Sequence, residues 1–124
     1  MDAELARHGL DDSACALVGF SQGTMMALHV GPQRKRRLAG ILGYSGLLAD
    51  PAALKTDAIQ KPPVMLIHGD MDDLIPVAAV FSAAQGLAAA EIPVEWHISS
   101  GVPHGIGPDG LELGLAFLKR VLPR

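Results

Sequence analysis

The sequence predicts an α/β fold built around a parallel sheet. Apolar runs alternate along the chain with segments of helical pattern, which is typical of strands separated by crossover helices. The runs are apolar at nearly every position rather than at every second one, as in strands buried on both faces of a parallel sheet. Short helical connections between such strands imply parallel pairing with right-handed crossovers.

Four strands follow from the apolar runs, at residues 14–20, 38–44, 64–67 and 94–98. We expect helices at residues 22–30, 76–90 and 110–122, with the tail of another at residues 3–8. Gly31 and Pro32 end the first full helix, and Pro76 suits the first turn of the second. The connection at residues 45–61 has some helical character around residues 51–59. In the last helix four leucines form one apolar stripe, namely Leu111, Leu115, Leu118 and Leu122.

The composition indicates a single domain over residues 1–124. Hydrophobic residues make up 49% of the chain and charged residues 19%, so the chain can bury a core and is not intrinsically disordered. Aromatic residues make up only 4%, so we expect the core to be aliphatic.

Charge, cysteine content and hydropathy exclude several classes of protein. The formal net charge of -3 argues against nucleic-acid binding. The one cysteine, Cys15, excludes an internal disulfide framework, and its apolar surroundings predict an inert buried thiol. No apolar run approaches the ~20 residues that a membrane span needs. The first residues lack the pattern of a signal peptide, so we expect a cytoplasmic protein.

Residues 19–23, Gly-Phe-Ser-Gln-Gly, lie where the first strand meets the first full helix. A G-x-S-x-G pattern between a strand and a helix is typical of a nucleophile elbow. The tight turn would hold Ser21 in a strained backbone conformation, and the two glycines would leave room for the strand and the helix to pack closely. The helix N-terminus beneath Ser21 favours developing negative charge. The alternative is an ordinary turn with Ser21 as helix N-cap.

A serine nucleophile needs a base to take its proton, and the sequence offers five histidines. His104 lies in the loop between the last strand and the last helix, at the sheet edge where Ser21 is expected. His8 and His29 lie on helical segments, and His97 lies inside a strand. His68 ends the third strand, where we expect it to order the following loop. His104 is therefore the predicted base, with a solvent-exposed loop histidine as the alternative.

The base needs a carboxylate that fixes its tautomer. The third strand leads into a loop with three of them, Asp70, Asp72 and Asp73, and position alone does not choose among the three. A calcium-binding loop is the rival interpretation, but the segment lacks the glycine and the distal glutamate of an EF-hand. The chain order serine, aspartate, histidine is that of α/β-hydrolases.

Three segments of the chain resemble the carboxylesterase/phospholipase family of α/β-hydrolases, which includes acyl-protein thioesterases. Residues 19–28 resemble the elbow of that family, residues 68–76 its acid loop and residues 101–104 its histidine loop. In the family the catalytic aspartate stands three residues after the glycine of the acid loop, which selects Asp72. The resemblance covers nearly the whole chain.

The resemblance implies hydrolysis of a small ester or acyl-thioester substrate through an acyl-enzyme, with no metal and no organic cofactor. Ser21 would attack the acyl carbonyl, His104 would relay the proton to the leaving group, and Asp72 would orient His104. The backbone N–H of Gln22 would supply one donor of the oxyanion hole. The sequence does not separate a lysophospholipase, an acyl-protein thioesterase and a carboxylesterase of small esters.

One departure from the family concerns the amino-terminal side. Members of the family begin with further strands and a His-Gly-rich loop that supplies a second oxyanion donor, and nothing in this sequence matches that loop. Only 20 residues precede Ser21, so we expect the carboxyl-terminal half of such a hydrolase. Its first strand would pair on one side only, which predicts a homodimer or pairing with the missing half. The alternative function is an inactive or weakly active half-fold that acts as a scaffold or interaction module.

Two further features each allow two interpretations. We expect the basic run at residues 34–37 to be a solvated loop, with attraction to anionic lipid headgroups as the alternative. We expect Met25 and Met26 to fill the core, with the lining of an acyl pocket as the alternative.

Overall fold

The computed structural model describes residues 2–56 and 58–123 and contains a four-stranded sheet with the order β1-β2-β3-β4. The strands are β1 (Ala16–Phe20), β2 (Gly40–Tyr44), β3 (Val64–Gly69) and β4 (Val94–Ser99). All three pairings are parallel, as the sequence predicts. Because parallel strands end at the same edge, the loops after β1, β3 and β4 all emerge at one side of the sheet.

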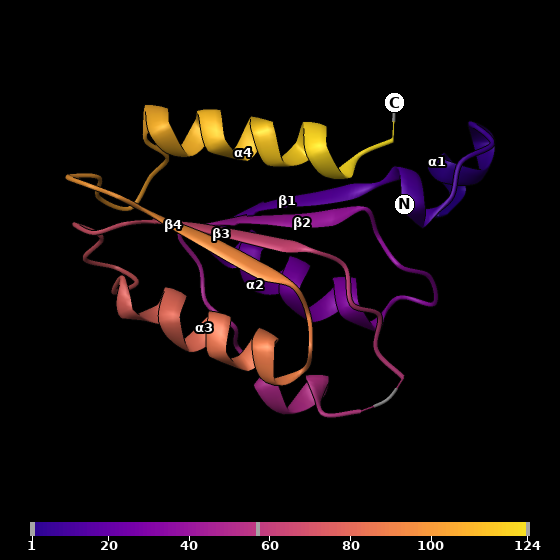
Figure 1. Cartoon of the computed structure of the whole chain (residues 1–124), viewed down its shortest axis with the longest axis horizontal. Helices are drawn as coiled ribbons and strands as arrows, with labels where there is room; N and C mark the ends of the chain where they lie inside the picture. The colour runs from indigo at the N-terminus through magenta and orange to yellow at the C-terminus, as the bar shows by residue number, and fades with distance from the viewer. Residues whose placement is uncertain (1, 57, 124) are drawn as a thin grey trace.

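Helices cover both faces of this sheet (Figure 1). Helices α2 (Gln22–Val30) and α3 (Ala78–Ala89) lie on one face, and α4 (Pro108–Val121) lies on the other. A short helix, α1 (Asp2–Arg7), precedes β1. Three 3₁₀ turns complete the elements: η1 (Asp12–Ala14), η2 (Gly31–Gln33) and η3 (Pro51–Leu54). The helical character expected at residues 51–59 is limited to η3, and residue 57 lies outside the described residues.

Two apolar cores flank the central strands. Alternate residues of β2 and β3 point to opposite faces, so Ile41 and Leu66 join one core while Leu42 and Ile67 join the other. Helices α2 and α3 complete the first core, and Phe117 of α4 completes the second. This arrangement explains why β2 and β3 are apolar at successive positions, and every residue of both strands is buried.

The first half of the leucine stripe of α4 does not contact the sheet, although Leu118 packs against the core beneath the helix. Its buried residues are Gly110, Gly114 and Phe117, whereas Leu111 and Leu115 are 54% and 51% exposed. A side chain at Gly114 would collide with the hydroxyl of Tyr44, which donates a hydrogen bond of 3.0 Å to the carbonyl of Gly110. The two glycines therefore let the helix approach the sheet closely, and Leu111 and Leu115 face away from the described core.

Strand β1 is an edge strand. Within the described residues it pairs with β2 alone, as the sequence predicts. The expectation of burial on both faces is wrong for β1, because Val18 is 57% and Phe20 42% exposed. Val18 and Phe20 pair in register with Leu42 and Tyr44 of β2. Because these two β2 residues belong to the core beneath α4, Val18 and Phe20 lie on the same face of the sheet as that core. An apolar strip thus continues from this core onto an uncovered edge.

Two sulfur-bearing side chains differ from expectation. Cys15 directly precedes β1 and is only half-buried, although burial is enough to raise the pKa of its thiol. Met26 is 61% exposed, so it does not fill the described core. The buried positions of α2 are Thr24, Ala27 and Leu28, and Met26 lies on the other side of that helix.

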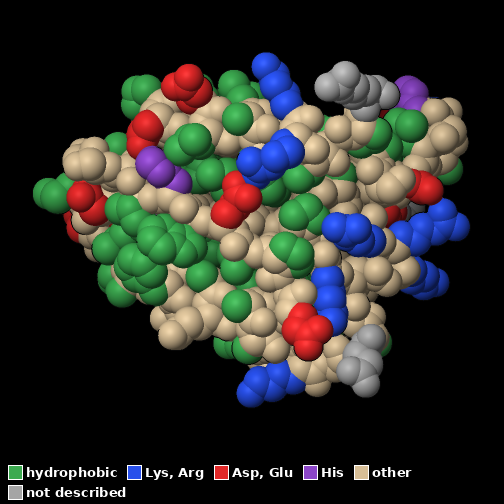
Figure 2. Space-filling view, in the orientation of Figure 1, with side chains coloured by type: hydrophobic (Ala, Val, Ile, Leu, Met, Phe, Trp, Pro, Cys, Tyr) green, Lys and Arg blue, Asp and Glu red, His purple; other side chains and the backbone are tan. Residues whose placement is uncertain are grey.

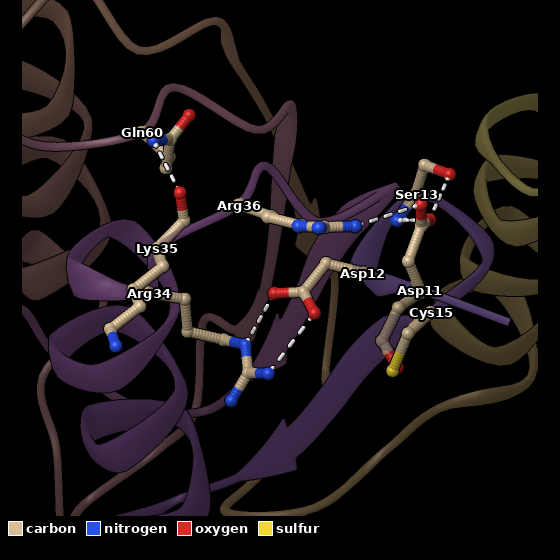
Figure 3. A network of polar contacts seen from close by, with 9 residues as sticks. Asp11, Asp12, Ser13, Cys15, Arg34, Lys35, Arg36 and Gln60 are labelled. Carbon is tan, nitrogen blue, oxygen red and sulfur yellow. Dashed lines mark hydrogen bonds and ion pairs between the residues drawn. The ribbon is translucent and has the colours of Figure 1, made fainter. Parts of the chain in front are cut away.

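The basic run at residues 34–37 makes ion pairs at the amino-terminal edge of the sheet (Figure 3). The guanidinium of Arg34 donates hydrogen bonds of 2.6 and 3.1 Å to the two carboxylate oxygens of Asp12. Arg36 lies 3.4 Å from a carboxylate oxygen of Asp11. Residues 35–37 are exposed, whereas Arg34 is partly buried, so the expected solvated loop is anchored at its first residue.

Candidate active site

Three predicted residues meet at the carboxyl-terminal edge of the sheet. Ser21 follows β1, Asp72 lies in the loop after β3, and His104 lies in the loop after β4. His104 Nε2 is 3.1 Å from Ser21 Oγ, and His104 Nδ1 is 2.7 Å from Asp72 Oδ2. The three side chains therefore form one continuous hydrogen-bonded run from loops that are far apart in the sequence.

The turn at Ser21 has the strain that the elbow pattern predicts. Ser21 has φ 55° and ψ -114°, a conformation that costs energy for a residue with a side chain. It makes no side-chain hydrogen bond to the first turn of α2, which disfavours the N-cap alternative. Its backbone N–H donates 2.9 Å to the carbonyl of Tyr44, so β2 holds the turn in place.

Close packing requires only one of the two elbow glycines. A Cβ atom at Gly19 would lie 2.5 Å from backbone atoms of Gly23 and Thr24. A Cβ at Gly23 would meet nothing within 4 Å. Thr24 also fixes the helix, since its hydroxyl donates 2.8 Å to the carbonyl of Tyr44. The steric explanation therefore holds for Gly19 and not for Gly23.

Asp72 is the carboxylate that reaches His104. Its side chain is fully buried, and its Oδ1 accepts hydrogen bonds of 2.9 and 2.8 Å from the N–H groups of Leu74 and Ile75. Burial opposes its ionisation, but the hydrogen bonds from His104 and from these two N–H groups together hold the pKa of Asp72 below its usual value. The ionised carboxylate only accepts hydrogen bonds, so the proton of His104 lies on Nδ1 and Nε2 accepts from Ser21.

The other candidate carboxylates of this loop have different positions. Asp70 is exposed and accepts a hydrogen bond of 2.8 Å from the backbone N–H of Gly101. Asp73 is exposed. The structure thus brings Asp72 to the histidine, and geometry makes the choice that spacing alone left open.

Two of the other histidines, His68 and His97, form hydrogen bonds to neighbouring loop and helix residues. His68 is buried and donates 2.7 Å to the carbonyl of Ile75, which orders the acid loop as expected. His97 lies on β4 and its Nε2 is 2.6 Å from Asp109 at the start of α4. The imidazole of His104 also contacts the ring of Phe20, and the two ring centroids lie 5.0 Å apart.

Ser45 is a site residue that sequence reasoning missed. It directly follows β2, is buried, and has a left-handed backbone with φ 51°. Its hydroxyl donates 3.1 Å to the carbonyl of Gly105, next to His104. A serine at the carboxyl end of a buried parallel strand, at the same edge as Ser21, is the signal that could have found it.

The backbone N–H of Gln22 belongs to the first turn of α2 and directly follows Ser21. First-turn N–H groups have no partner within their helix, so this donor suits the expected role toward an oxyanion. Among residues 2–56 and 58–123 no group of three or more His, Cys, Asp or Glu side chains is placed to hold a metal ion. No helix of this described part is long and apolar enough to cross a membrane.

The parallel sheet and the elbow together define part of an α/β-hydrolase fold. The chain belongs to the phospholipase/carboxylesterase family, whose model matches residues 1–122. It is 35% identical to acyl-protein thioesterase 1 of Gibberella zeae, covering 93% of this chain and 51% of the relative. It is 32% identical to acyl-protein thioesterase 1 of Saccharomyces cerevisiae, covering 92% and 52%.

Solved structures agree with this assignment. The crystal structure of esterase PE8 superposes with a TM-score of 0.92 at 42% identity, covering 98% of this chain and 56% of that one. The chain therefore spans about half the length of the curated relatives and of the solved esterase that it matches.

Proposed function

We propose that this chain carries the catalytic triad of a serine hydrolase that acts on carboxylic esters or acyl thioesters. The observation that carries the proposal is the hydrogen-bonded run from Ser21 through His104 to Asp72. Membership of the phospholipase/carboxylesterase family supports it independently.

The chemistry follows from the positions of the three side chains. Ser21 Oγ attacks the acyl carbonyl while His104 Nε2 takes its proton, and Asp72 stabilises the imidazolium that forms. The negative charge on the carbonyl oxygen develops near the N-terminus of α2, where the N–H of Gln22 donates to it. His104 then protonates the leaving alcohol or thiol, and water, activated by the same histidine, releases the acid from Ser21.

The substrate class rests on the relatives and on the charge around the site. The relatives are named acyl-protein thioesterases and esterases, so both thioesters and oxygen esters belong to the proposal. The segments 45–50, 70–77 and 100–112 at this edge contain carboxylates and no Lys or Arg. In Figure 2 the Lys and Arg side chains are spread over the middle and the right half of the view, away from the left end, where the loops after β3 and β4 emerge in Figure 1. We therefore expect neutral acyl groups to be preferred over acyl groups that carry a carboxylate.

A second candidate function is a scaffold or interaction module with little activity. The chain spans about half of its relatives, and only one oxyanion donor, the N–H of Gln22, is assigned within it. Loss of one such donor costs about 10²–10³ in kcat. If the chain acts alone, we expect turnover at least about 100-fold slower than that of a full-length relative on the same short ester.

Labelling with an active-site fluorophosphonate tests the proposal. Stoichiometric labelling of folded wild-type chain at Ser21, abolished in Ser21→Ala and His104→Ala, is the expected result. Folding of each variant is checked by circular dichroism. Folded wild-type protein that takes up no label would favour the scaffold instead.

A further inference from the structure

The distance between His104 and Asp72 depends on two loops that α3 and β4 separate in the sequence. The acid loop follows β3 and the histidine loop follows β4. The histidine loop contains glycines on both sides of His104, at Gly101 and Gly105, and Gly101 has φ +73°. Glycines allow many backbone conformations, so this loop needs external contacts to hold the imidazole in place.

The two loops are joined where they leave the sheet. The N–H of Asp70 donates 3.1 Å to the carbonyl of Ser99, and the N–H of Met71 donates 3.0 Å to the carbonyl of Val102. A side chain at Gly69 would collide with the carbonyl oxygen of Val102, so the loops are in direct contact. Both hydrogen bonds join backbone groups, so most side-chain substitutions would leave them in place.

One side chain of the acid loop adds to this junction. Asp70 Oδ1 accepts 2.8 Å from the N–H of Gly101, the residue whose left-handed conformation turns the histidine loop. On the far side of His104, the hydroxyl of Ser45 holds the carbonyl of Gly105. The histidine is thus flanked by two side-chain anchors, one at each of the glycines Gly101 and Gly105.

We propose that Asp70 is a positioning residue that holds the histidine loop, and so keeps His104 within reach of both Asp72 and Ser21. It acts through the backbone of Gly101 rather than through the imidazole. Its effect on catalysis rests on the proposed function, whereas its effect on the loop does not. A carboxylate is well suited to this role because a charged acceptor makes a stronger hydrogen bond to an N–H group than a neutral one.

Three variants test the role of Asp70. Asp70→Ala removes the acceptor, Asp70→Asn keeps a carbonyl oxygen at the same place, and Asp73→Ala removes an exposed carboxylate of the same loop as a matched control. Amide hydrogen exchange at Gly101 and the NMR signal of the His104 Nδ1 proton report the loop without any substrate. Turnover of p-nitrophenyl acetate, split into kcat and KM, reports the catalytic consequence.

We expect Asp70→Ala to speed amide exchange at Gly101, to broaden or shift the His104 proton signal, and to lower kcat by about 10- to 100-fold with little change in KM. Asp70→Asn should restore most of each loss, and Asp73→Ala should match wild type. Unchanged exchange and an unchanged proton signal in Asp70→Ala would overturn the inference, as would failure of Asp70→Asn to restore them. Absence of turnover and of fluorophosphonate labelling in wild type would sink the proposed function, while the exchange data would still decide the role of Asp70.

Discussion

At the scale of single residues, the three aspartates of the acid loop show how the position of a side chain determines its role. Asp70, Asp72 and Asp73 lie within four positions of each other, yet only Asp72 is buried. Two backbone N–H groups and His104 compensate the cost of burying its charge. The result is an ionised carboxylate that is fixed in one orientation, which is the property that a histidine base requires.

Replacement of this carboxylate gives the first prediction. We expect Asp72→Asn to lower ester turnover by about 10²–10⁴-fold, because the amide no longer fixes the histidine tautomer or stabilises the imidazolium. Asp70→Asn and Asp73→Asn should stay within a few-fold of wild type. Steady-state hydrolysis of a p-nitrophenyl ester measures all three, and a loss in Asp73→Asn equal to that in Asp72→Asn would contradict the assignment of Asp72.

The pair Arg34–Asp12 predicts a pH dependence of stability. The hydrogen bond from Arg34 holds the pKa of Asp12 below its usual value despite burial. The folded pKa is lower than the unfolded one, so this carboxylate stabilises the fold above the unfolded pKa of about 3.9, and the contribution is lost as pH falls through the folded pKa. We expect the free energy of unfolding, from urea titrations between about pH 2 and pH 5, to fall less steeply on acidification in Asp12→Asn.

Arg34→Gln is the partner variant for this measurement. It removes the same ion pair by replacing the cation. The free energy of unfolding should then depend less steeply on pH in the acid range, to a similar extent. If the free energy of unfolding falls with pH as steeply in both variants as in wild type, other carboxylates are responsible for the loss of stability in acid.

At the scale of elements, the elbow depends on backbone contact between β1 and α2. The Cβ of an alanine at position 19 would lie 2.5 Å from backbone atoms of Gly23 and Thr24, and backbone cannot move aside as a flexible side chain can. The same change at Gly23 meets open space, so the two glycines of one motif offer a matched pair.

We expect Gly19→Ala to lower the free energy of unfolding by about 1–3 kcal/mol, as overpacking typically does. Gly23→Ala should be neutral or stabilising by up to about 1 kcal/mol, because alanine is the better helix former. Denaturant titration measures both values. Equal stability of the two variants would show that the strand and the helix can separate without loss.

The elements also show what sequence patterns could and could not predict. The runs of β2 and β3 were predictable because burial on both faces leaves an unbroken apolar signal. The orientation of α4 was not, since Leu111 and Leu115 of its leucine stripe are exposed, while Gly110, Gly114 and Phe117 are buried against the sheet. Small residues carry no hydrophobic signal, and their role appears only once Tyr44 is seen beside them.

The three triad residues were predictable because they lie in loops that directly follow predicted strands. Ser21 and His104 follow from motif and position, and Asp72 follows from the family resemblance. Ser45 and the bond from Asp70 to Gly101 escaped detection because they connect loops that are remote in sequence. Contacts of that kind depend on the packed arrangement of strands, which no local pattern encodes.

At the scale of the whole molecule, apolar side chains are left uncovered on the face of the sheet that carries α4. Val18 and Phe20 of β1 are exposed on the face that α4 partly covers, and Leu111 and Leu115 of α4 are exposed as well. The corresponding relatives are about twice as long as this chain. An unprotected apolar edge strand recruits other strands, and exposed apolar patches favour association.

We therefore predict that the chain alone forms dimers or larger assemblies through the β1 edge. Residues 16–20 contain no charge and no proline that would protect this edge. Val18→Lys places a charge on the exposed face and should shift the light-scattering mass toward the monomer over a concentration series. It is a better disrupting change than Leu17→Lys, because Leu17 packs against the core. Val30→Lys, at a valine 40% exposed on α2, is the matched control and should leave association unchanged. A wild-type chain that stays monomeric at the highest concentration would contradict the prediction and show that this half-length fold is stable without a partner.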